Sequence, residues 1–301
     1  MEPTPILKHA PPAAAPVSVS GFVSGLPREA ARPERLWLIA GTGEGPGLAR
    51  ELLDRGWRLR VSVVSPEARL AYPKAPGLEV VVGALEGAGA WRAALDAARD
   101  EGDPFLWLLD ASHPFATRVS ATVAEACQGR PETLLRLRRP LLAAPGATTL
   151  PDLQHLADHL APGERLLLAI GARHLATAIA HSPLACHHSR VLPHPRALRE
   201  ALRAGLPPHR VACVHPTADG AVERALCQRW GIDAILCRQS GSRAEGVWLR
   251  LHETLGLRLL LLRRPPEPLG VAGLLPPELL ARVGWPGSAE NGGNASSPWS
   301  P

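Results

Sequence analysis

Short apolar runs alternate with amphipathic segments along most of this chain of 301 residues. An apolar run of strand length followed by residues at helical spacing predicts a βαβ unit, and repeated units of that kind predict a parallel sheet. We expect strands at residues 36–40, 59–64, 79–82, 105–109, 134–137, 166–170, 211–214, 232–237 and 258–262. We expect helices at residues 48–55, 91–99, 116–127, 174–180 and 221–230.

The alternation divides into two halves at residues 143–149, a break rich in Pro, Gly and Ala. We therefore predict an α/β protein with two Rossmann-like βα lobes and parallel sheets, a nucleotide-binding lobe at residues 34–142 and a second lobe at 150–270. Two such lobes predict an interlobe cleft, a common place for a small-molecule site. Residues 1–33 and 286–301 are rich in small residues and Pro without periodicity, which predicts a disordered extension and a disordered tail.

Composition excludes several classes of protein. The five cysteines include no Cys-x-x-Cys pair, which argues against a disulfide framework and a structural zinc site. No apolar run reaches the roughly 18 residues that a membrane helix needs. The N-terminus lacks the layout of a secretory signal, so we expect a cytoplasmic protein without membrane contact. Arginines are not interleaved with aromatic residues, so nucleic acid is not an expected partner.

The charge is unevenly distributed between the two halves. Residues 34–139 carry 14 basic and 14 acidic side chains, whereas residues 150–266 carry 15 basic and 9 acidic ones. The second half therefore offers a positive field to an anionic ligand. Solvated helix faces rich in arginine are the alternative reading of the same excess.

The turn after the first expected strand is the candidate for cofactor binding. It reads Gly-Thr-Gly-Glu-Gly-Pro-Gly, and its candidate residues are Gly41, Thr42, Gly43 and Glu44. Glycines let a backbone approach a phosphate, and the following helix N-terminus offers donors and a favourable dipole. The spacing departs from the dinucleotide fingerprint because Pro46 stands where the third glycine belongs. Nucleotide binding and a purely structural turn both remain open.

The second expected strand bears on the choice of cofactor. An acidic residue at its end would bind the adenosine ribose and favour NAD. This strand instead carries Arg60 and Ser62, with Arg69 close behind. Arginine and hydroxyl groups suit a 2′-phosphate, so NADPH is the preferred cofactor. A surface arginine with no ligand is the alternative.

The run at residues 105–116 predicts a site at the end of a strand. Its apolar part ends abruptly in Asp110, Ser112 and His113, at the sheet edge where parallel sheets bind ligands. His113 could act as an acid or base, anchor a ligand as a donor, or be a loop histidine. No Gly-x-Ser-x-Gly elbow supports a hydrolase. The His187-His188 pair predicts no metal site, because adjacent strand residues point to opposite faces.

Several of these segments together resemble one family. The glycine-threonine turn, the run Asp-Ala-Ser-His-Pro-Phe-Ala at 110–116, Leu-Arg-Leu-Arg-Arg-Pro at 135–140 and Arg-Gln-Ser-Gly at 238–241 resemble the precorrin-6A reductases of cobalamin biosynthesis. The closing strand and Arg-Arg-Pro-Pro at 263–266 are also similar to that family. The resemblance covers about residues 35–266, and its most specific element is the run at 110–116.

The resemblance implies NADPH-dependent reduction of one carbon–carbon double bond in precorrin-6A or cobalt-precorrin-6A, a polycarboxylate macrocycle held between the lobes. It implies a positioning or proton-donating role for His113. Arginine suits such a ligand because its planar fork binds two carboxylate oxygens. The residues that we expect to bind substrate are Ser112, Pro114, Phe115, Arg139, Arg173, Ser240 and Gly241. The expected partners are this small molecule and other enzymes of the cobalamin pathway.

Two alternatives remain open at this point. The loop at residues 215–219 begins His-Pro-Thr where the family usually has Gly-Pro-Phe, and Arg-Gln replaces Lys-Asn at 238–239. A tetrapyrrole- or nucleotide-binding protein that has lost catalysis would tolerate such changes. An NADPH reductase of another substrate would also tolerate them.

Overall fold

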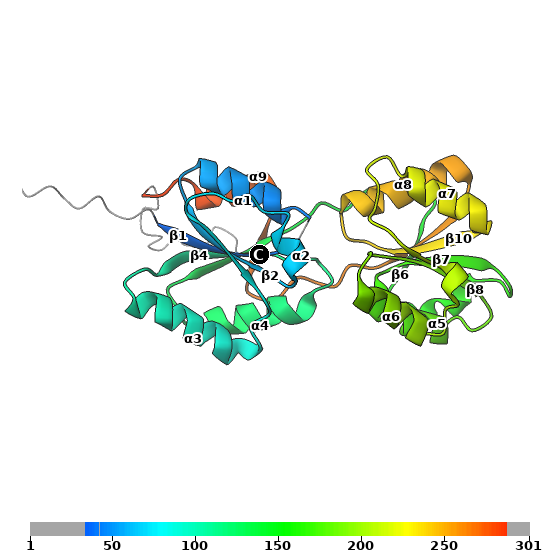
Figure 1. The fold of residues 1–301 in the computed structure, drawn as a ribbon, viewed down its shortest axis with the longest axis horizontal. Helices are drawn as coiled ribbons and strands as arrows, with labels where there is room; N and C mark the ends of the chain where they lie inside the picture. Colours follow the sequence, from blue (N-terminus) through cyan, green and yellow to red (C-terminus); the bar gives the residue numbers. More distant parts are fainter. Residues whose placement is uncertain (1–33, 42, 288–301) are drawn as a thin grey trace, which may run out of the picture. The chain divides into compact units, whose positions relative to one another are not determined.

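The computed structural model describes residues 34–41 and 43–287 of the chain. They form two six-stranded sheets in which every strand pairing is parallel. The strand order is β12-β5-β4-β1-β2-β3 in the first sheet and β6-β11-β10-β7-β8-β9 in the second. The prediction of an α/β fold with two βα lobes is confirmed (Figure 1).

The first lobe is built almost entirely from the N-terminal half of the chain. Its strands are β1 (Arg35–Ala40), β2 (Arg58–Val63), β3 (Leu78–Val82), β4 (Phe105–Ala111), β5 (Thr133–Leu137) and β12 (Ala272–Leu274). Its helices are α1 (Gly45–Asp54), α2 (Pro66–Arg69), α3 (Gly87–Asp100), α4 (Thr117–Cys127) and α9 (Pro276–Val283). Helices thus follow strands in the order that the alternation predicts.

The second lobe repeats the same arrangement. Its strands are β6 (Thr148–Leu150), β7 (Arg165–Ala169), β8 (Cys186–Val191), β9 (Val211–Cys213), β10 (Ala234–Arg238) and β11 (Arg258–Leu262). Its α-helices are α5 (Leu175–Ala180), α6 (Pro195–Arg203), α7 (Ala221–Trp230) and α8 (Arg243–Leu255). Short 3₁₀ turns, among them 153–155 and 172–174, fill the connections.

Each sheet is buried on both faces, which explains why its central strands are apolar throughout. In β1, Leu36 and Leu38 pack under α1 and α9, while Trp37 and Ile39 pack against α3 and α4. Figure 1 shows these helix pairs on opposite faces of the first sheet. In the second sheet, α5 and α6 cover one face, and α7 and α8 cover the other. Burial of each large apolar side chain contributes about 1.5–3 kcal/mol.

Several elements were not among those expected from the sequence, including strands β6, β8 and β12 and helix α9. The chain returns to the first sheet after β11, where β12 pairs with β5 and α9 adds Leu279 and Val283 to the core. Strand β8 was not among the strands expected from apolar runs, although His187 and His188 were treated as strand residues, because its buried centre is polar. His187 hydrogen bonds to Ser182, and the Ser189 hydroxyl donates to the Leu168 carbonyl. Strand β6 begins inside the segment expected to be a linker.

The predicted terminal segments are mostly outside the described residues. That applies to residues 1–33, to residues 288–301 and to Thr42 of the glycine turn. Of the predicted C-terminal tail, Pro286 and Gly287 are described, and the Gly287 N–H donates to the Glu34 carboxylate at 3.0 Å. None of the helices in residues 34–41 and 43–287 has the length and apolar character needed to cross a bilayer.

Candidate functional site

The strand order of the first sheet places two predicted loops side by side. The chain leaves β1 toward β2 on one side, and it leaves β4 toward β5 on the other side. Ala40 of β1 pairs with Ala111 of β4, so Gly41 and Ser112 begin neighbouring loops. Ligands of open parallel sheets bind at such a reversal of strand order, at the carboxyl ends of the strands. The glycine turn and the His113 loop therefore begin side by side at the reversal of strand order, where a ligand is expected to bind.

The glycine turn is held by the single tyrosine of the chain. The Tyr72 hydroxyl donates to the Gly41 carbonyl at 2.7 Å, and burial raises the pKa of Tyr72, so the hydroxyl remains a donor. A Cβ at Gly45 would lie 2.2 Å from the Tyr72 Oη and 2.7 Å from the Ala40 Cβ. Gly45 is thus required by close approach. Pro46 fits the first turn of α1, where an N–H would lack an intrahelical partner.

Arg139 lies over this turn, and one of its guanidinium nitrogens has no partner among the described residues. Its Nη2 donates to the Glu44 carboxylate at 2.6 Å, and a Cβ at Gly43 would lie 3.7 Å from the same nitrogen. The side chain is only 9% exposed, and within the described part of the chain its buried Nη1 has no hydrogen-bond partner. A buried guanidinium nitrogen without a partner is costly. A guanidinium in this place, over the turn that leads into α1, suits the binding of an anionic group at the N-terminus of that helix.

A buried ion network fixes the start of the His113 loop. Arg136 of β5 donates to the Asp110 carboxylate, to the Glu267 carboxylate and, at 2.6 Å, to the Ser120 hydroxyl. Asp110 in turn accepts from the Ser112 N–H at 2.9 Å. Arg136 therefore has two carboxylate partners. The network positions the loop, and it explains why an acid ends an otherwise apolar strand.

His113 is half-buried, and its ring orientation is defined by hydrogen bonds. Its Nδ1 accepts from the Phe115 N–H at 3.2 Å, and its main-chain carbonyl accepts from the Ala116 N–H at 2.7 Å. Burial, together with the positive charges of four nearby arginines, lowers the pKa of His113 to about 3. The ring is therefore neutral at physiological pH. Pro114, beside it, is buried, whereas Phe115 is half-buried.

The corresponding position of the second sheet carries arginines instead of an open glycine turn. There the strand order reverses between β7 and β10, which places Gly171 near Arg238. The Arg238 guanidinium lies 5.2 Å from the centre of the Phe115 ring. Burial and the neighbouring Arg173 lower the pKa of Arg238 to about 10. Among the described residues, neither Arg173 nor Arg238 donates a side-chain hydrogen bond or forms an ion pair.

The loop before α8 is already closed by a carboxylate. Glu245 is 2% exposed, and its Oε2 accepts from the Ser240 and Gly241 N–H groups, both at 2.6 Å. A Cβ at Gly241 would lie 2.3 Å from the Pro140 carbonyl oxygen. The predicted residues Ser240 and Gly241 thus have evident structural roles. An incoming phosphate at this helix start would compete with Glu245.

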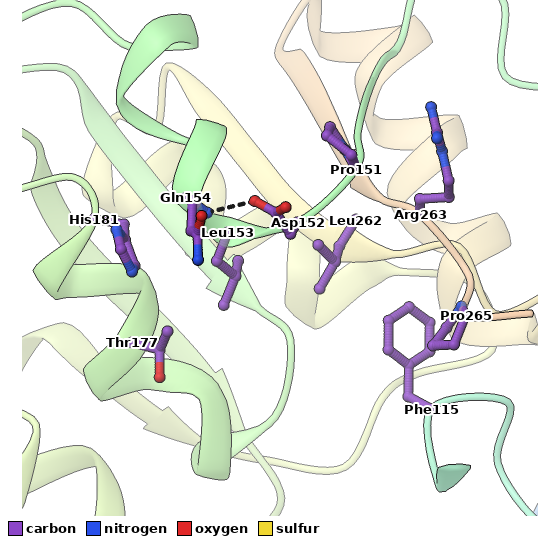
Figure 2. Close-up of a pocket in the computed structure, with 10 residues that line it drawn as sticks. All are labelled: Phe115, Pro151, Asp152, Leu153, Gln154, Thr177, His181, Leu262, Arg263 and Pro265. Atoms are coloured by element: carbon purple, nitrogen blue, oxygen red, sulfur yellow. Dashed lines mark hydrogen bonds between the residues drawn. The ribbon is translucent and has the colours of Figure 1, made fainter.

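An open pocket of about 330 Å³ adjoins Phe115 (Figure 2). Its walls are mainly apolar and come from the 3₁₀ turn at 153–155, from α5 and from the end of β11. Thr177 of α5 and His181, directly after that helix, line one side, with Phe115 and Pro265 across from them. The remaining lining residues are Pro151, Asp152, Leu153, Gln154, Leu262 and Arg263.

The structure does not bring Arg60 and Ser62 to the crevice. Arg60 pairs with Trp37, three residues before β2 ends, and its guanidinium binds the Glu79 carboxylate at 2.9 Å and 3.0 Å. The Ser62 hydroxyl accepts from the Trp37 indole N–H at 2.9 Å. Their partners are therefore within the protein. Arg69, on α2 beyond the end of β2, is exposed.

Four residues that support this region were not candidates in the sequence analysis. They are Tyr72, Glu245, Arg264 and Glu267. Arg264 donates to the main-chain carbonyls of Gln239 and Arg139, at 3.1 Å and 2.6 Å. Its place in the Arg-Arg-Pro-Pro segment is the only sequence signal that could have indicated it. Tyr72 gave no signal besides being the only tyrosine.

Three comparisons with known proteins indicate the same family. A family model described as Precorrin-6x reductase CbiJ/CobK matches residues 35–278. The chain is 33% identical over 243 residues to a cobalt-precorrin-6A reductase of Synechocystis sp., covering 76% of this chain and 88% of that protein. It is 30% identical to a precorrin-6A reductase of Rhodococcus erythropolis, covering 78% and 90%. A solved structure, CobK precorrin-6A reductase, superposes with a TM-score of 0.66 at 24% identity, covering 83% of this chain and 96% of that chain.

Proposed function

The chain belongs to the precorrin-6x reductase family, and on that premise we propose that it reduces one carbon–carbon double bond of precorrin-6A or cobalt-precorrin-6A with NADPH. A reduction of this kind takes a hydride from a nicotinamide, and the protein binds, orients and shields the reactants. We further propose that it acts in the cytoplasm on this small molecule, in contact with other enzymes of the same pathway.

We place the NADPH in the first lobe because its helix start is open. The observation that carries this placement is the buried Nη1 of Arg139, which has no hydrogen-bond partner among the described residues and belongs to the guanidinium whose Nη2 lies beside Gly43. No side chain caps α1, and its first turn has no acidic residue. At α8, by contrast, the Ser242 side chain caps the helix and the Glu245 carboxylate occupies the N–H groups of the preceding loop. A phosphate of the cofactor would therefore meet free donors at α1 and a buried carboxylate at α8.

Arg69 is the residue we assign to the 2′-phosphate that distinguishes NADPH from NADH. It is exposed on α2, directly after β2, the position that contacts the adenosine ribose in dinucleotide folds. Ser65 precedes it and is half-buried as the cap of α2. Arg60 is not assigned this role because Glu79 holds its guanidinium.

We place the carboxylates of the macrocycle at the arginines around Phe115. Arg173 and Arg238 have no ion-pair partner among residues 34–41 and 43–287, and Arg238 is stacked on an aromatic ring. Clustered, partly dehydrated guanidiniums suit bidentate binding of carboxylates. The apolar pocket beside Phe115 would take a ring edge of the macrocycle (Figure 2). Arg136 is not included, because Asp110 and Glu267 already neutralise it.

The test is anaerobic incubation of the purified protein with NADPH and each of the two macrocycles. We expect one NADPH to be consumed for each macrocycle that gains two hydrogens, measured by absorbance and mass spectrometry. Arg238→Gln should raise KM for the macrocycle without weakening NADPH binding, and Arg229→Gln, at an exposed position on α7, is the matched control. NADPH binding without oxidation, in the presence of bound macrocycle, would contradict the proposal.

A further inference from the structure

Tyr72 connects the two ends of the proposed cofactor site. Its hydroxyl donates to the carbonyl of Gly41, the first residue of the glycine turn, at 2.7 Å. Its main-chain N–H donates to the carbonyl of Arg69, the residue assigned to the 2′-phosphate, at 3.1 Å. We propose that Tyr72 is a positioning residue that holds the glycine turn at a fixed distance from Arg69, so that the preference for NADPH over NADH depends on the Tyr72 hydroxyl. This inference rests on the proposed function and names the residue that joins the two parts of its cofactor site.

The chain from α2 to Tyr72 is a compact segment. The Ser65 side chain caps α2 by accepting from the Ala68 N–H at 3.3 Å. Beyond Arg69 the next three N–H groups each donate to the carbonyl three residues earlier, so the turns continue as far as Tyr72. Ala68 and Tyr72 are buried in the core of the first lobe together with Ala40, the last residue of β1. This segment therefore has little freedom to move apart from the end of β1, where the glycine turn begins.

The Tyr72 hydroxyl reaches Gly41 through space that a side chain at position 45 would fill. A Cβ at Gly45 would lie 2.2 Å from the Oη of Tyr72 and 3.3 Å from its Cζ. Tyr72 is 6% exposed, and burial raises its pKa, so the hydroxyl remains a donor. Because a buried donor that loses its partner is costly, the Gly41 carbonyl is held toward Tyr72. Its oxygen, which would repel a phosphate, is thereby kept on the protein side of the exposed turn.

A fixed distance between the glycine turn and Arg69 favours NADPH in particular. NADPH would attach at two points, with its diphosphate at the turn and its 2′-phosphate at Arg69. When the two points are held together, the second contact forms at a high effective concentration once the first has formed. NADH has no 2′-phosphate, so it gains only from the preorganisation of the turn. Loss of the Tyr72 hydroxyl should therefore weaken NADPH binding more than NADH binding.

The first test is a double-variant cycle in which the binding of both cofactors is measured. Kd values for NADPH and NADH are determined by calorimetry for the wild-type protein, Tyr72→Phe, Arg69→Ala and the double variant. We expect Tyr72→Phe to raise the Kd for NADPH about tenfold and that for NADH less than about threefold. In the Arg69→Ala background, Tyr72→Phe should have the same small effect on both cofactors. Equal losses for both cofactors in Tyr72→Phe, or losses of NADPH affinity that simply multiply in the double variant, would overturn the inference.

Ser189→Ala is the matched control for the loss of a hydrogen bond as such. The Ser189 hydroxyl is buried in the second lobe and donates to the Leu168 carbonyl at 3.1 Å, so this substitution also removes one bond from a hydroxyl to a main-chain carbonyl. We expect it to lower the free energy of unfolding without changing either Kd. A selective loss of NADPH affinity in Ser189→Ala would overturn the inference, because general destabilisation would then explain the effect of Tyr72→Phe.

The second test needs no substitution of the tyrosine. Tyr72 is the only tyrosine of the chain, so protein labelled with ¹³C-tyrosine gives the NMR signals of this ring alone. We expect adenosine 2′-monophosphate, which carries the 2′-phosphate but no diphosphate, to shift these signals, and the shift to disappear in Arg69→Ala. Unshifted signals at saturating adenosine 2′-monophosphate, or a shift that persists in Arg69→Ala, would overturn the inference.

These outcomes are distinguishable from failure of the proposed function. If the wild-type protein binds neither cofactor, the proposed function fails and the inference fails with it. If it binds NADPH and NADH with the same Kd, the assignment of Arg69 and this inference fail, whereas a reductase activity measured with either cofactor stands. If it prefers NADPH and Tyr72→Phe leaves that preference unchanged, only the role of Tyr72 is rejected.

Discussion

Arg139→Gln is the substitution that most sharply tests the cofactor site. Arg139 neutralises Glu44 through a 2.6 Å ion pair and keeps its buried Nη1 free. A charge-assisted hydrogen bond to a cofactor phosphate is worth about 1.5–3 kcal/mol. Its loss alone weakens binding by roughly 10–150-fold. The substitution also leaves the Glu44 carboxylate unpaired at the start of α1, where it repels the same phosphate.

The repulsion can be measured separately with the double variant. A like charge at a partly exposed position costs about 1 kcal/mol, so we expect Arg139→Gln to raise the Kd for NADPH roughly 100-fold. Glu44→Gln in the same protein removes the unpaired carboxylate and should recover about fivefold of that loss. Arg138→Gln is the control, because Arg138 is the exposed neighbour in the chain.

Isothermal titration calorimetry at one fixed salt concentration provides the values. The protein is folded in every variant if its far-UV circular dichroism is unchanged. A wild-type Kd for NADPH in Arg139→Gln would refute the placement of a phosphate beside this residue. An equal Kd in the single and double variants would refute the repulsion by Glu44.

Four further predictions concern stability and cofactor choice. Gly45→Ala should cost about 1–3 kcal/mol in urea unfolding because its Cβ would lie 2.2 Å from the Tyr72 Oη, whereas Gly47→Ala, with no atom within 4 Å, should not destabilise; equal effects would contradict the close approach. Asp110→Asn should cost about 3 kcal/mol by removing a buried partner of Arg136, and Glu267→Gln less, because Glu267 is 29% exposed; the reverse order in urea unfolding would be inconsistent with this network. Arg69→Ala should raise KM for NADPH about tenfold and leave that for NADH unchanged, and equal losses would remove Arg69 from the 2′-phosphate site. Below pH 6.5 the unfolded chain gains a proton at His113 that the folded chain, with its His113 pKa of about 3, does not gain. The free energy of unfolding should therefore fall more steeply with acid in wild type than in His113→Gln, and parallel curves would argue against a neutral His113 ring in the folded state.

The apolar strands and their alternation with helices were sufficient to predict the two parallel sheets. Leu36, Leu38 and Leu108 are fully buried in strands that read as continuous apolar runs. The pattern was insufficient for β8, where His187, His188 and Ser189 are buried but polar. Their hydrogen bonds depend on neighbouring segments, which periodicity does not report. The return of β12 to the first sheet is a long-range pairing that local sequence does not encode.

The candidate site was predicted in part. The sequence indicated the glycine turn and the His113 loop, and the strand order places them at one reversal point. It did not indicate that Tyr72 supports the turn, because nothing in a lone tyrosine specifies a carbonyl 31 residues away. Arg60 was a natural candidate for a phosphate until its pairing with Glu79 was visible. Whether an arginine binds a carboxylate of the protein or is left available for a ligand is known only once the contacts of the folded chain are known.

Transfer of a labelled hydride tests the central claim most directly. The protein is incubated with NADPH deuterated at the transferring position of the nicotinamide, together with precorrin-6A or its cobalt form, and the macrocycle is analysed by mass spectrometry. We predict a reduced macrocycle carrying one deuterium from the cofactor, and one deuterium from solvent when the reaction is run instead in deuterated water with unlabelled NADPH. Reduced macrocycle without cofactor deuterium, or no reduced macrocycle while both ligands are bound, would contradict the account.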